Sequence, residues 1–265
     1  MHFPKILFKN RKYPSRRKQI QTPSITKMSK TILFLTLTIM LILQTQAYDY
    51  YKFAVELPGA VCRSKSCTST YMGGLSAYTL NMHGMWPNSN DGSTAENCLA
   101  NNYDESQFTS TILSELNNDW VGLYSSSSSF RSHEWGKHGT CWAQQNENPG
   151  LNRFLGSRRY GTTSTPYFQA MNDYFSKAMS VKNSLNIEAA IFKVSQAEVQ
   201  TTLQDIQSAL SSQLGVSTFD LYCSSNLLTE IRFCIDLDYA PMECPDSPNI
   251  QCTSSGAITI VGTIN

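Results

Sequence analysis

This 265-residue chain lacks several motifs that would indicate a catalytic mechanism, a metal site or a modification. It has no Gly-x-Ser-x-Gly, the nucleophile turn of many serine hydrolases, and no Cys-x-x-Cys, a common part of structural zinc sites. It also has no Asn-x-Ser/Thr sequon, so N-glycosylation is not expected. Histidine is scarce, with four residues in all. A serine nucleophile and a zinc site are therefore not expected, and the positions of the few histidines become informative.

Acidic residues are absent from the first 47 positions, which hold 9 of the 21 Lys and Arg residues. An apolar run over residues 31–43 follows lysines and precedes Thr45-Gln46-Ala47, a small-x-small cleavage pattern. The run is shorter than the about 20 apolar residues that a membrane-spanning helix needs. We therefore expect a signal peptide at residues 28–47, preceded by a basic extension at residues 1–27 that lies upstream of the true start. No membrane segment is expected in the mature form.

Residues 48–265 are expected to form one domain, and they carry a strong negative charge. Without the leader, 12 Lys and Arg face 20 Asp and Glu, a net charge of −8. An acidic body repels polyanions on average, so affinity for a nucleic acid must come from local cations and stacking. Tight, strongly salt-dependent binding of long nucleic acids is not expected.

All eight cysteines follow the leader, and an even number in a chain bound for an oxidising compartment predicts four disulfides. Zinc is the alternative, but the short spacings do not match the usual ligand pattern. Spacing alone leaves the pairing open.

Hydrophobic patterns predict strands and helices without a regular alternation. Strands are expected at Tyr51–Leu57, stopped by Pro58-Gly59, at Ile231–Leu237, where apolar and polar residues alternate, and at Ile258–Val261. Helices are expected at Gln107–Leu116 capped by Ser106, from Thr165-Pro166 onward, and after the capping-box pair Ser195 and Glu198 up to Leu214 and Gly215. The serine run 125–129 is expected to be a loop. This mixture favours an α+β domain with a central antiparallel sheet.

In the second helix, apolar side chains recur every four residues, at Tyr167, Met171, Phe175 and Met179. This spacing is typical of a buried helix face. We interpret these side chains as core and not as a cofactor site.

Three of the four histidines fall in two short segments, His83-Gly-Met-Trp-Pro-Asn and His133-Glu-Trp-Gly-Lys-His-Gly. Metal-independent RNA cleavage needs a base for the ribose 2′-hydroxyl, an acid for the departing 5′-oxygen and cations for the phosphorane. Histidine can act as acid or base near neutral pH. A zinc metalloprotease is disfavoured, because its motif needs histidines four apart on one helical face, whereas His133 and His138 are five apart.

The two segments resemble the paired active-site signatures of the T2 family of secreted acid endoribonucleases, which includes plant S-like and self-incompatibility enzymes. The second signature, His-Glu-Trp-x-Lys-His-Gly-Thr-Cys, is complete at residues 133–141, and the first carries Met85 where leucine is usual. The resemblance implies the same α+β fold. Weaker similarity extends from about Tyr48 to the C-terminus.

By this resemblance, His138 would act as the base and His83 as the acid in the transfer step, with the roles reversed in hydrolysis. His133 would bind the phosphate, while Glu134 and Lys137 would stabilise the transition state. The resemblance also implies the disulfides Cys62 with Cys67, Cys98 with Cys141, Cys223 with Cys252, and Cys234 with Cys244. The chain departs from the family pattern at Glu56-Leu57-Pro58 and at Phe130-Arg131-Ser132, so the substrate subsites are expected to differ.

Aromatic and amide residues in these segments have competing roles. Trp135 is interpreted as core packing. Trp86 is expected to present a face on which a base stacks. Asn88 is either a contact to a base edge or an exposed loop residue.

The resulting expectation is a secreted or vacuolar endoribonuclease that cleaves single-stranded RNA through a 2′,3′-cyclic phosphate to a 3′-phosphate, without metal or cofactor. It is expected to be a monomer with no obligate protein partner. The alternatives on the same scaffold are a recognition protein such as a self-incompatibility determinant, or a storage or defence protein. Self-incompatibility relatives tend to be basic, so the charge of −8 favours the degradative S-like group.

Overall fold

The computed structural model describes residues 48–68, 70, 74–146, 165–192, 197–253 and 255–263. The strands are β1 (Tyr50–Glu56), β2 (Asn81–Asn88), β3 (Glu198–Thr201), β4 (Asp220–Ser224), β5 (Leu227–Ile235), β6 (Pro241–Met242) and β7 (Ile258–Val261). The α-helices are α2 (Pro58–Ser64), α3 (Ser110–Asp119), α4 (Ser127–Glu134), α5 (Thr140–Asn146), α7 (Thr165–Leu185), α8 (Ile187–Ile191) and α9 (Leu203–Leu214). A 3-10 turn, η2 (Glu105–Gln107), and a π-helical segment, η3 (Trp135–Gly139), complete the described elements.

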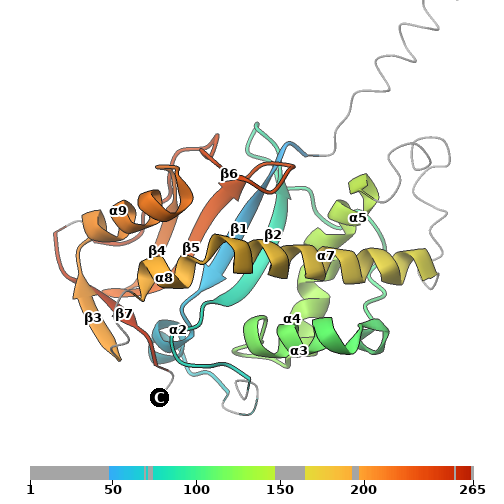
Figure 1. Cartoon of the computed structure of the whole chain (residues 1–265), viewed down its shortest axis with the longest axis horizontal. Helices are drawn as coiled ribbons and strands as arrows, with labels where there is room; N and C mark the ends of the chain where they lie inside the picture. The colour runs from blue at the N-terminus through green and yellow to red at the C-terminus, as the bar shows by residue number, and fades with distance from the viewer. Residues whose placement is uncertain are drawn as a thin grey trace, which may run out of the picture. The chain divides into compact units, whose positions relative to one another are not determined.

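The strands form one sheet with the order β2-β1-β5-β7-β3, and β4 and β6 also pair with β5. All these pairings are antiparallel except β5 with β7, which is parallel at Leu227 and Thr259. The predicted α+β class is therefore correct, while the sheet is mixed instead of wholly antiparallel. Helix α7 crosses one face of the sheet, and α3, α4 and α5 lie beyond the β2 edge (Figure 1).

The predicted alternation along β5 divides the side chains between the two faces of the sheet. Ile231, Phe233 and Ile235 are fully buried, whereas Glu230 and Arg232 are only partly buried. The predicted strand at Ile258–Val261 is confirmed as β7, and β1 begins one residue earlier than predicted. Pro58 does end β1, but it also opens helix α2, because proline is well tolerated in the first turn.

Helix α7 packs its predicted apolar face into the core. Tyr167, Met171, Phe175 and Met179 are each at most 1% exposed, so the interpretation as core is confirmed. In the part of the chain that the structure describes, no helix combines the length and the apolar composition needed to cross a membrane.

Two predictions were wrong because other side chains provide the helix caps. Ser106 does not begin a long helix: Asp104 caps the short turn η2 there, and α3 begins only after Thr109, whose hydroxyl accepts from Ile112 N–H. Most of the serine run expected to be a loop belongs to the start of α4: the Ser126 side chain accepts from Ser129 N–H, and Ser127–Ser129 form the first turn.

The third helix starts later than its capping box predicted. Ser195 lies outside the described residues, and Glu198 begins strand β3. Helix α9 is instead capped by Thr202, which accepts from Asp205 N–H. Its predicted end is correct: Gly215 adopts φ 73°, a conformation that suits glycine after a helix.

Four disulfides join the eight cysteines: Cys62–Cys67, Cys98–Cys141, Cys223–Cys252 and Cys234–Cys244. These are the four pairs that the family resemblance implied. Cys98–Cys141 connects the segment after β2 to helix α5, immediately after the second histidine segment.

The two disulfides that differ most in sequence separation should differ in their stabilising effect. Cys98–Cys141 has a separation of 43 residues and Cys62–Cys67 one of 5. Because a disulfide restricts the unfolded chain, removal of these two disulfides should lower the free energy of unfolding by about 4 and about 2 kcal/mol, respectively. The double variant Cys98→Ser/Cys141→Ser should therefore lower the melting temperature by roughly 8–16 °C, about twice the effect of Cys62→Ser/Cys67→Ser. Equal shifts, or the reverse order in calorimetry, would contradict this account.

Candidate active site

Strand β2 and the α4–η3 helical segment bring the two histidine segments together. The Trp86 indole on β2 donates through Nε1 to Glu134 Oε2 at the end of α4, at 2.8 Å. Gly84 makes this approach possible, since a Cβ at that position would collide with both of these atoms. Further along, Tyr174 OH of helix α7 donates to Met85 O at 3.0 Å. The strand and the helical segment are thus fixed side by side.

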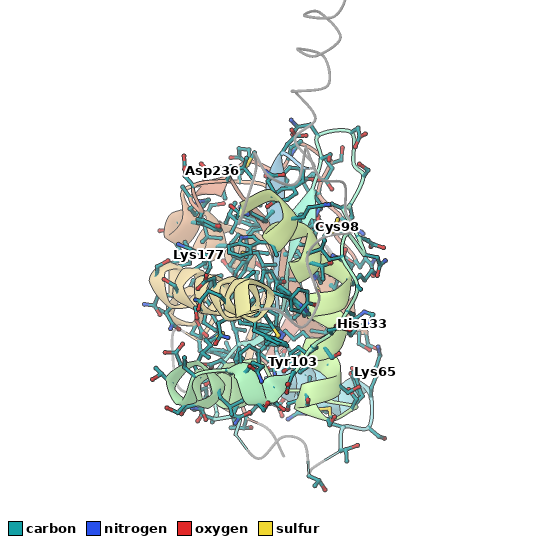
Figure 2. All side chains as sticks on the ribbon, turned by 90° about the vertical axis from the view of Figure 1, so that its right-hand side faces the viewer. Lys65, Cys98, Tyr103, His133, Lys177 and Asp236 are labelled. Atoms are coloured by element: carbon teal, nitrogen blue, oxygen red, sulfur yellow. A yellow bond between two sulfur atoms is a disulfide. The ribbon has the colours of Figure 1, made fainter. Side chains whose placement is uncertain are left out.

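The segment from His133 to His138 contains a π-helical turn. Thr140 N–H bonds to Trp135 O, five residues earlier, where an α-helix bonds four residues earlier. The argument that two histidines five apart cannot share a metal ion assumed a regular α-helix, and this assumption was wrong. The positive charge of His133 lowers the pKa of His138. His133 is exposed and is labelled on the right-hand side of the molecule in Figure 2.

His83 lies between two carboxylates. Its Nδ1 is 3.0 Å from Glu230 Oε1 and 4.0 Å from Glu56 Oε1. Burial disfavours the charged imidazole, but the bond to Glu230 and the charge of Glu56 outweigh it and raise the pKa of His83 to about 9. Glu230 also accepts from Arg232 Nε at 2.8 Å, and although its burial acts in the opposite direction, these bonds lower the pKa of Glu230. His83 is therefore a stable imidazolium at neutral pH.

His138 has the opposite environment. Its side chain is buried, and burial together with the positive charges of Lys137, His133 and His83 lowers the pKa of His138 to about 3. Nδ1 of His138 is buried without a hydrogen-bond partner among the described residues. This imidazole is therefore neutral and available to accept a proton.

The two remaining charged residues of the segment occupy different positions. Glu134 is buried, which raises the pKa of its carboxyl to about 7, although His83 and the Trp86 bond partly oppose this. Lys137 is more exposed, and its Nζ lies 3.2 Å from Glu96 Oε1. Glu134 therefore gains or loses its proton near neutral pH, while Lys137 supplies a cation at the rim of the site.

Trp86 lies against both catalytic candidates. Its ring centroid lies 5.0 Å from that of His83, at an interplanar angle of 83°, and 5.4 Å from that of His138. The Arg232 guanidinium also contacts the ring, at 4.8 Å from its centroid. The indole therefore has several neighbours in the site, and base stacking on it stays a prediction.

The other two residues considered in the sequence are structural. Trp135 is fully buried and donates to Tyr167 OH at 2.6 Å, which confirms its interpretation as packing. The expectation of an exposed loop for Asn88 was wrong: its buried amide donates to Trp86 O and accepts from Thr94 Oγ1. These bonds hold the end of β2, and nothing in this geometry supports a contact between Asn88 and a base.

A cavity of about 490 Å³ opens beside His83. Its wall includes carboxylates and aromatic rings, among them Glu56, Tyr124, Phe130, Tyr222 and Glu230. Sequence reasoning missed Glu230 and Arg232, which it treated only as the polar side of a strand. Glu56 was noted as a departure from the family pattern, without a position in the site.

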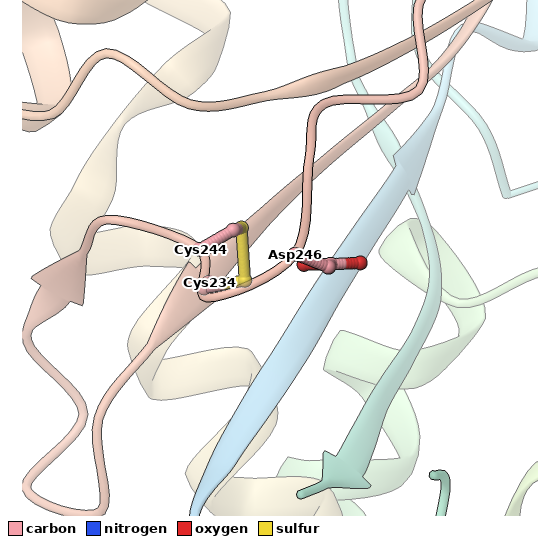
Figure 3. A group of neighbouring side chains, drawn as sticks. All are labelled: Cys234, Cys244 and Asp246. Carbon is pink, nitrogen blue, oxygen red and sulfur yellow. A yellow bond between two sulfur atoms is a disulfide. The ribbon is translucent and has the colours of Figure 1, made fainter. Parts of the chain in front are cut away.

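Among the described residues, one group of potential metal ligands comes together, formed by Cys234, Cys244 and Asp246. The two sulfur atoms are bonded to each other, so they cannot act as thiolate ligands (Figure 3). Asp246 is 2.6 Å from Lys52 Nζ. The group is therefore a disulfide beside an ion pair.

Comparisons with known proteins identify the family of this chain. Residues 48–244 match the Ribonuclease T2 family. The chain is 27% identical over 236 residues to extracellular ribonuclease LE of Solanum lycopersicum, covering 84% of this chain and 92% of the relative. It is 26% identical over 233 residues to intracellular ribonuclease LX of the same plant, covering 84% and 88%. The solved structure of RNase NT in complex with 5′-AMP aligns with a TM-score of 0.61 at 25% identity, over 79% of this chain and 97% of that chain.

The family match covers most of the chain, including both histidine segments, and the structural match reproduces the α+β fold. The resemblance seen in the sequence is thereby confirmed. This chain belongs to the ribonuclease T2 family.

Proposed function

We propose that the protein is an endoribonuclease that cleaves single-stranded RNA by transphosphorylation, followed by hydrolysis of the cyclic product. The observation that carries this proposal is the pair His83 and His138, which both lie against Trp86 and have pKa values shifted in opposite directions. A neutral imidazole and an imidazolium next to each other are what acid–base catalysis at phosphorus needs. The binding of 5′-AMP by RNase NT supports a nucleotide substrate.

In the first step, His138 takes the proton of the ribose 2′-hydroxyl, and the 2′-oxygen forms a bond to phosphorus. The bond from phosphorus to the 5′-oxygen breaks, and that oxygen receives the proton of His83. In the second step His83, now neutral, takes a proton from water, whose oxygen attacks phosphorus. The bond to the 2′-oxygen breaks, this oxygen receives the proton from His138, and a 3′-phosphate is left.

Three further side chains would stabilise the charge that develops on the phosphorane. His133 is exposed and Lys137 is partly exposed, and the positive charges of both act on His138. Glu134 has a pKa raised to about 7 by burial, so it can hold a proton towards an equatorial phosphate oxygen. The cavity beside His83, with Tyr124, Phe130 and Tyr222 in its wall, is suited to the flat ring of the leaving nucleoside.

Targeting and physiological role also belong to this proposal. We infer that residues 28–47 direct the chain into the secretory pathway, residues 1–27 precede the true start, and residues 48–265 act as a monomeric domain. The relatives include an enzyme named extracellular and one named intracellular, which fits either secretion or retention in a vacuole. The net charge of −8 supports the degradative group over a recognition protein.

The central prediction is that cleavage depends on a ribose 2′-hydroxyl and not on a metal. In excess EDTA, the purified mature protein should cut a DNA oligonucleotide that contains one ribose only on the 3′ side of that ribose. Mass spectrometry should detect a 2′,3′-cyclic phosphate first and a 3′-phosphate later. Comparable cleavage of the all-deoxy control, or loss of activity in EDTA, would reject the mechanism.

Replacement of either histidine of the pair should abolish proton transfer without unfolding the protein. His83→Phe and His138→Phe should each lower kcat by about 100- to 10,000-fold, the usual range for losing acid or base catalysis. His133→Phe should raise KM as well as lower kcat, because His133 is assigned to the phosphate. Steady-state kinetics and a melting curve for each variant check this, and near-normal turnover by a folded His83 or His138 variant would refute the assignment.

A further inference from the structure

Arg232 lies beside the histidine pair in an unusually fixed position. Its guanidinium carbon is 4.8 Å from the Trp86 ring centroid and 4.4 Å from that of Tyr222, so the planar cation lies between two aromatic rings. Its Nε donates to Glu230 at 2.8 Å. Three contacts in different directions therefore hold the side chain in place before any ligand arrives.

The outer edge of this guanidinium is available to a ligand. Within the described part of the chain, Nε provides its one hydrogen bond, and the two terminal nitrogen atoms have no protein acceptor. The Arg232 side chain is 24% exposed. A planar fork of N–H donors with an accessible edge matches the geometry of two phosphate oxygens.

The charges around Arg232 largely balance one another. Glu230 is shared by Arg232 and the His83 imidazolium, and Glu56 lies 4.0 Å from His83 Nδ1, so two positive and two negative groups meet here. Asp220, which faces Arg232 across the sheet, accepts instead from Lys52 at 3.0 Å. The attraction of Arg232 for a phosphate therefore comes from the two terminal nitrogen atoms of its own guanidinium and not from a local surplus of positive charge.

The position of Arg232 relative to His83 indicates which phosphate it would meet. His83 protonates the 5′-oxygen in the proposed reaction, so the leaving nucleoside lies on its side of the site. Arg232 is joined to His83 through their shared partner Glu230, whereas Arg232 and His138 have in common only a contact with the Trp86 ring. The guanidinium is thus next to the scissile position, on the side of the leaving nucleoside.

We propose that Arg232 binds the phosphate on the 3′ side of the leaving nucleoside, the first phosphate beyond the scissile one. This inference rests on the proposed ribonuclease function and on its assignment of His83 as the acid. It makes the enzyme favour chains over dinucleotides, since a dinucleotide lacks the phosphate that Arg232 would hold.

The test uses three substrates with one cleavable bond each. The first is a dimer of one ribonucleotide followed by one deoxyribonucleotide, the second carries an added 3′-terminal phosphate, and the third an added 5′-terminal phosphate. The quantity measured is the ratio of kcat/KM for each phosphorylated dimer to that of the plain dimer. A ratio isolates the added phosphate from any general effect of a substitution on catalysis.

The mature wild-type protein should prefer the 3′-phosphorylated dimer by at least about tenfold, as expected for hydrogen bonds between a guanidinium and a phosphate. Arg232→Gln should reduce this ratio towards one and leave the ratio for the 5′-phosphorylated dimer unchanged. The matched control is Arg63→Gln, which removes a guanidinium paired with Glu198 in another part of the fold and should keep the wild-type ratios. If Arg232→Gln lowers the melting temperature, Arg232→Lys serves in its place and should keep only part of the preference.

Three results would overturn the proposal. A wild-type ratio near one would mean that the added phosphate is not bound. An unchanged ratio in the Arg232 variants, with an equal loss on all three substrates, would mean that Arg232 only braces Trp86 and His83. Loss of the ratio for the 5′-phosphorylated dimer alone would reject the assigned side. If the wild-type protein cleaved none of the three substrates, the proposed function itself would fall.

Discussion

The hydrogen bond between the Trp86 indole and the buried Glu134 carboxylate is the contact on which the geometry of the site depends. It joins strand β2 to helix α4, which are far apart in the sequence. It forms only because Gly84 leaves room for it. A buried carboxyl without a donor is costly, so Glu134 and the indole N–H stabilise each other's position. The Cys98–Cys141 disulfide anchors the same helical segment at its far end. The hydrogen bond between Trp86 and Glu134 therefore determines how His83 and His138 are placed relative to each other.

The charges nearest to each imidazole, and not burial alone, separate their protonation states. Burial lowers the pKa of both histidines, yet Glu230 and Glu56 reverse its effect at His83, while Lys137 and His133 reinforce it at His138. Both imidazoles lie against the same Trp86 ring, so the two environments belong to one site. An acid and a base can therefore act within one site over the same range of pH.

Local sequence patterns predicted the buried residues correctly where burial depends on a single helix or strand. The four-residue spacing in α7 and the apolar run of β7 predicted core residues correctly, because burial there follows from helical and strand periodicity. The prediction of a loop at the serine run was wrong, because the side chain of Ser126 caps a helix there. A serine-rich composition does not suggest a helix. The histidine segments were found because their residue types are rare in this chain.

The rest of the site depends on contacts between distant segments, which no local pattern contains. Glu56 and Glu230 are paired across β1 and β5, and both approach His83 only when the sheet forms. The same pairing of β1 with β5 also positions Arg232, which donates to Glu230. The π turn in the second histidine segment also has no spacing signature, so an argument based on regular helices could not anticipate it.

The proposed mechanism requires the two imidazoles to be held in opposite protonation states. The most direct measurement is an NMR titration of the His83 and His138 ring signals in the folded mature protein, with the matched variant Glu230→Gln. We expect His83 to stay protonated through neutral pH and to lose its proton near pH 9, while His138 stays neutral down to about pH 3. Glu230→Gln should lower the pKa of His83, because the neutral amide no longer favours the imidazolium. Titration of both rings near 6.5, or a higher pKa for His138 than for His83, would contradict it.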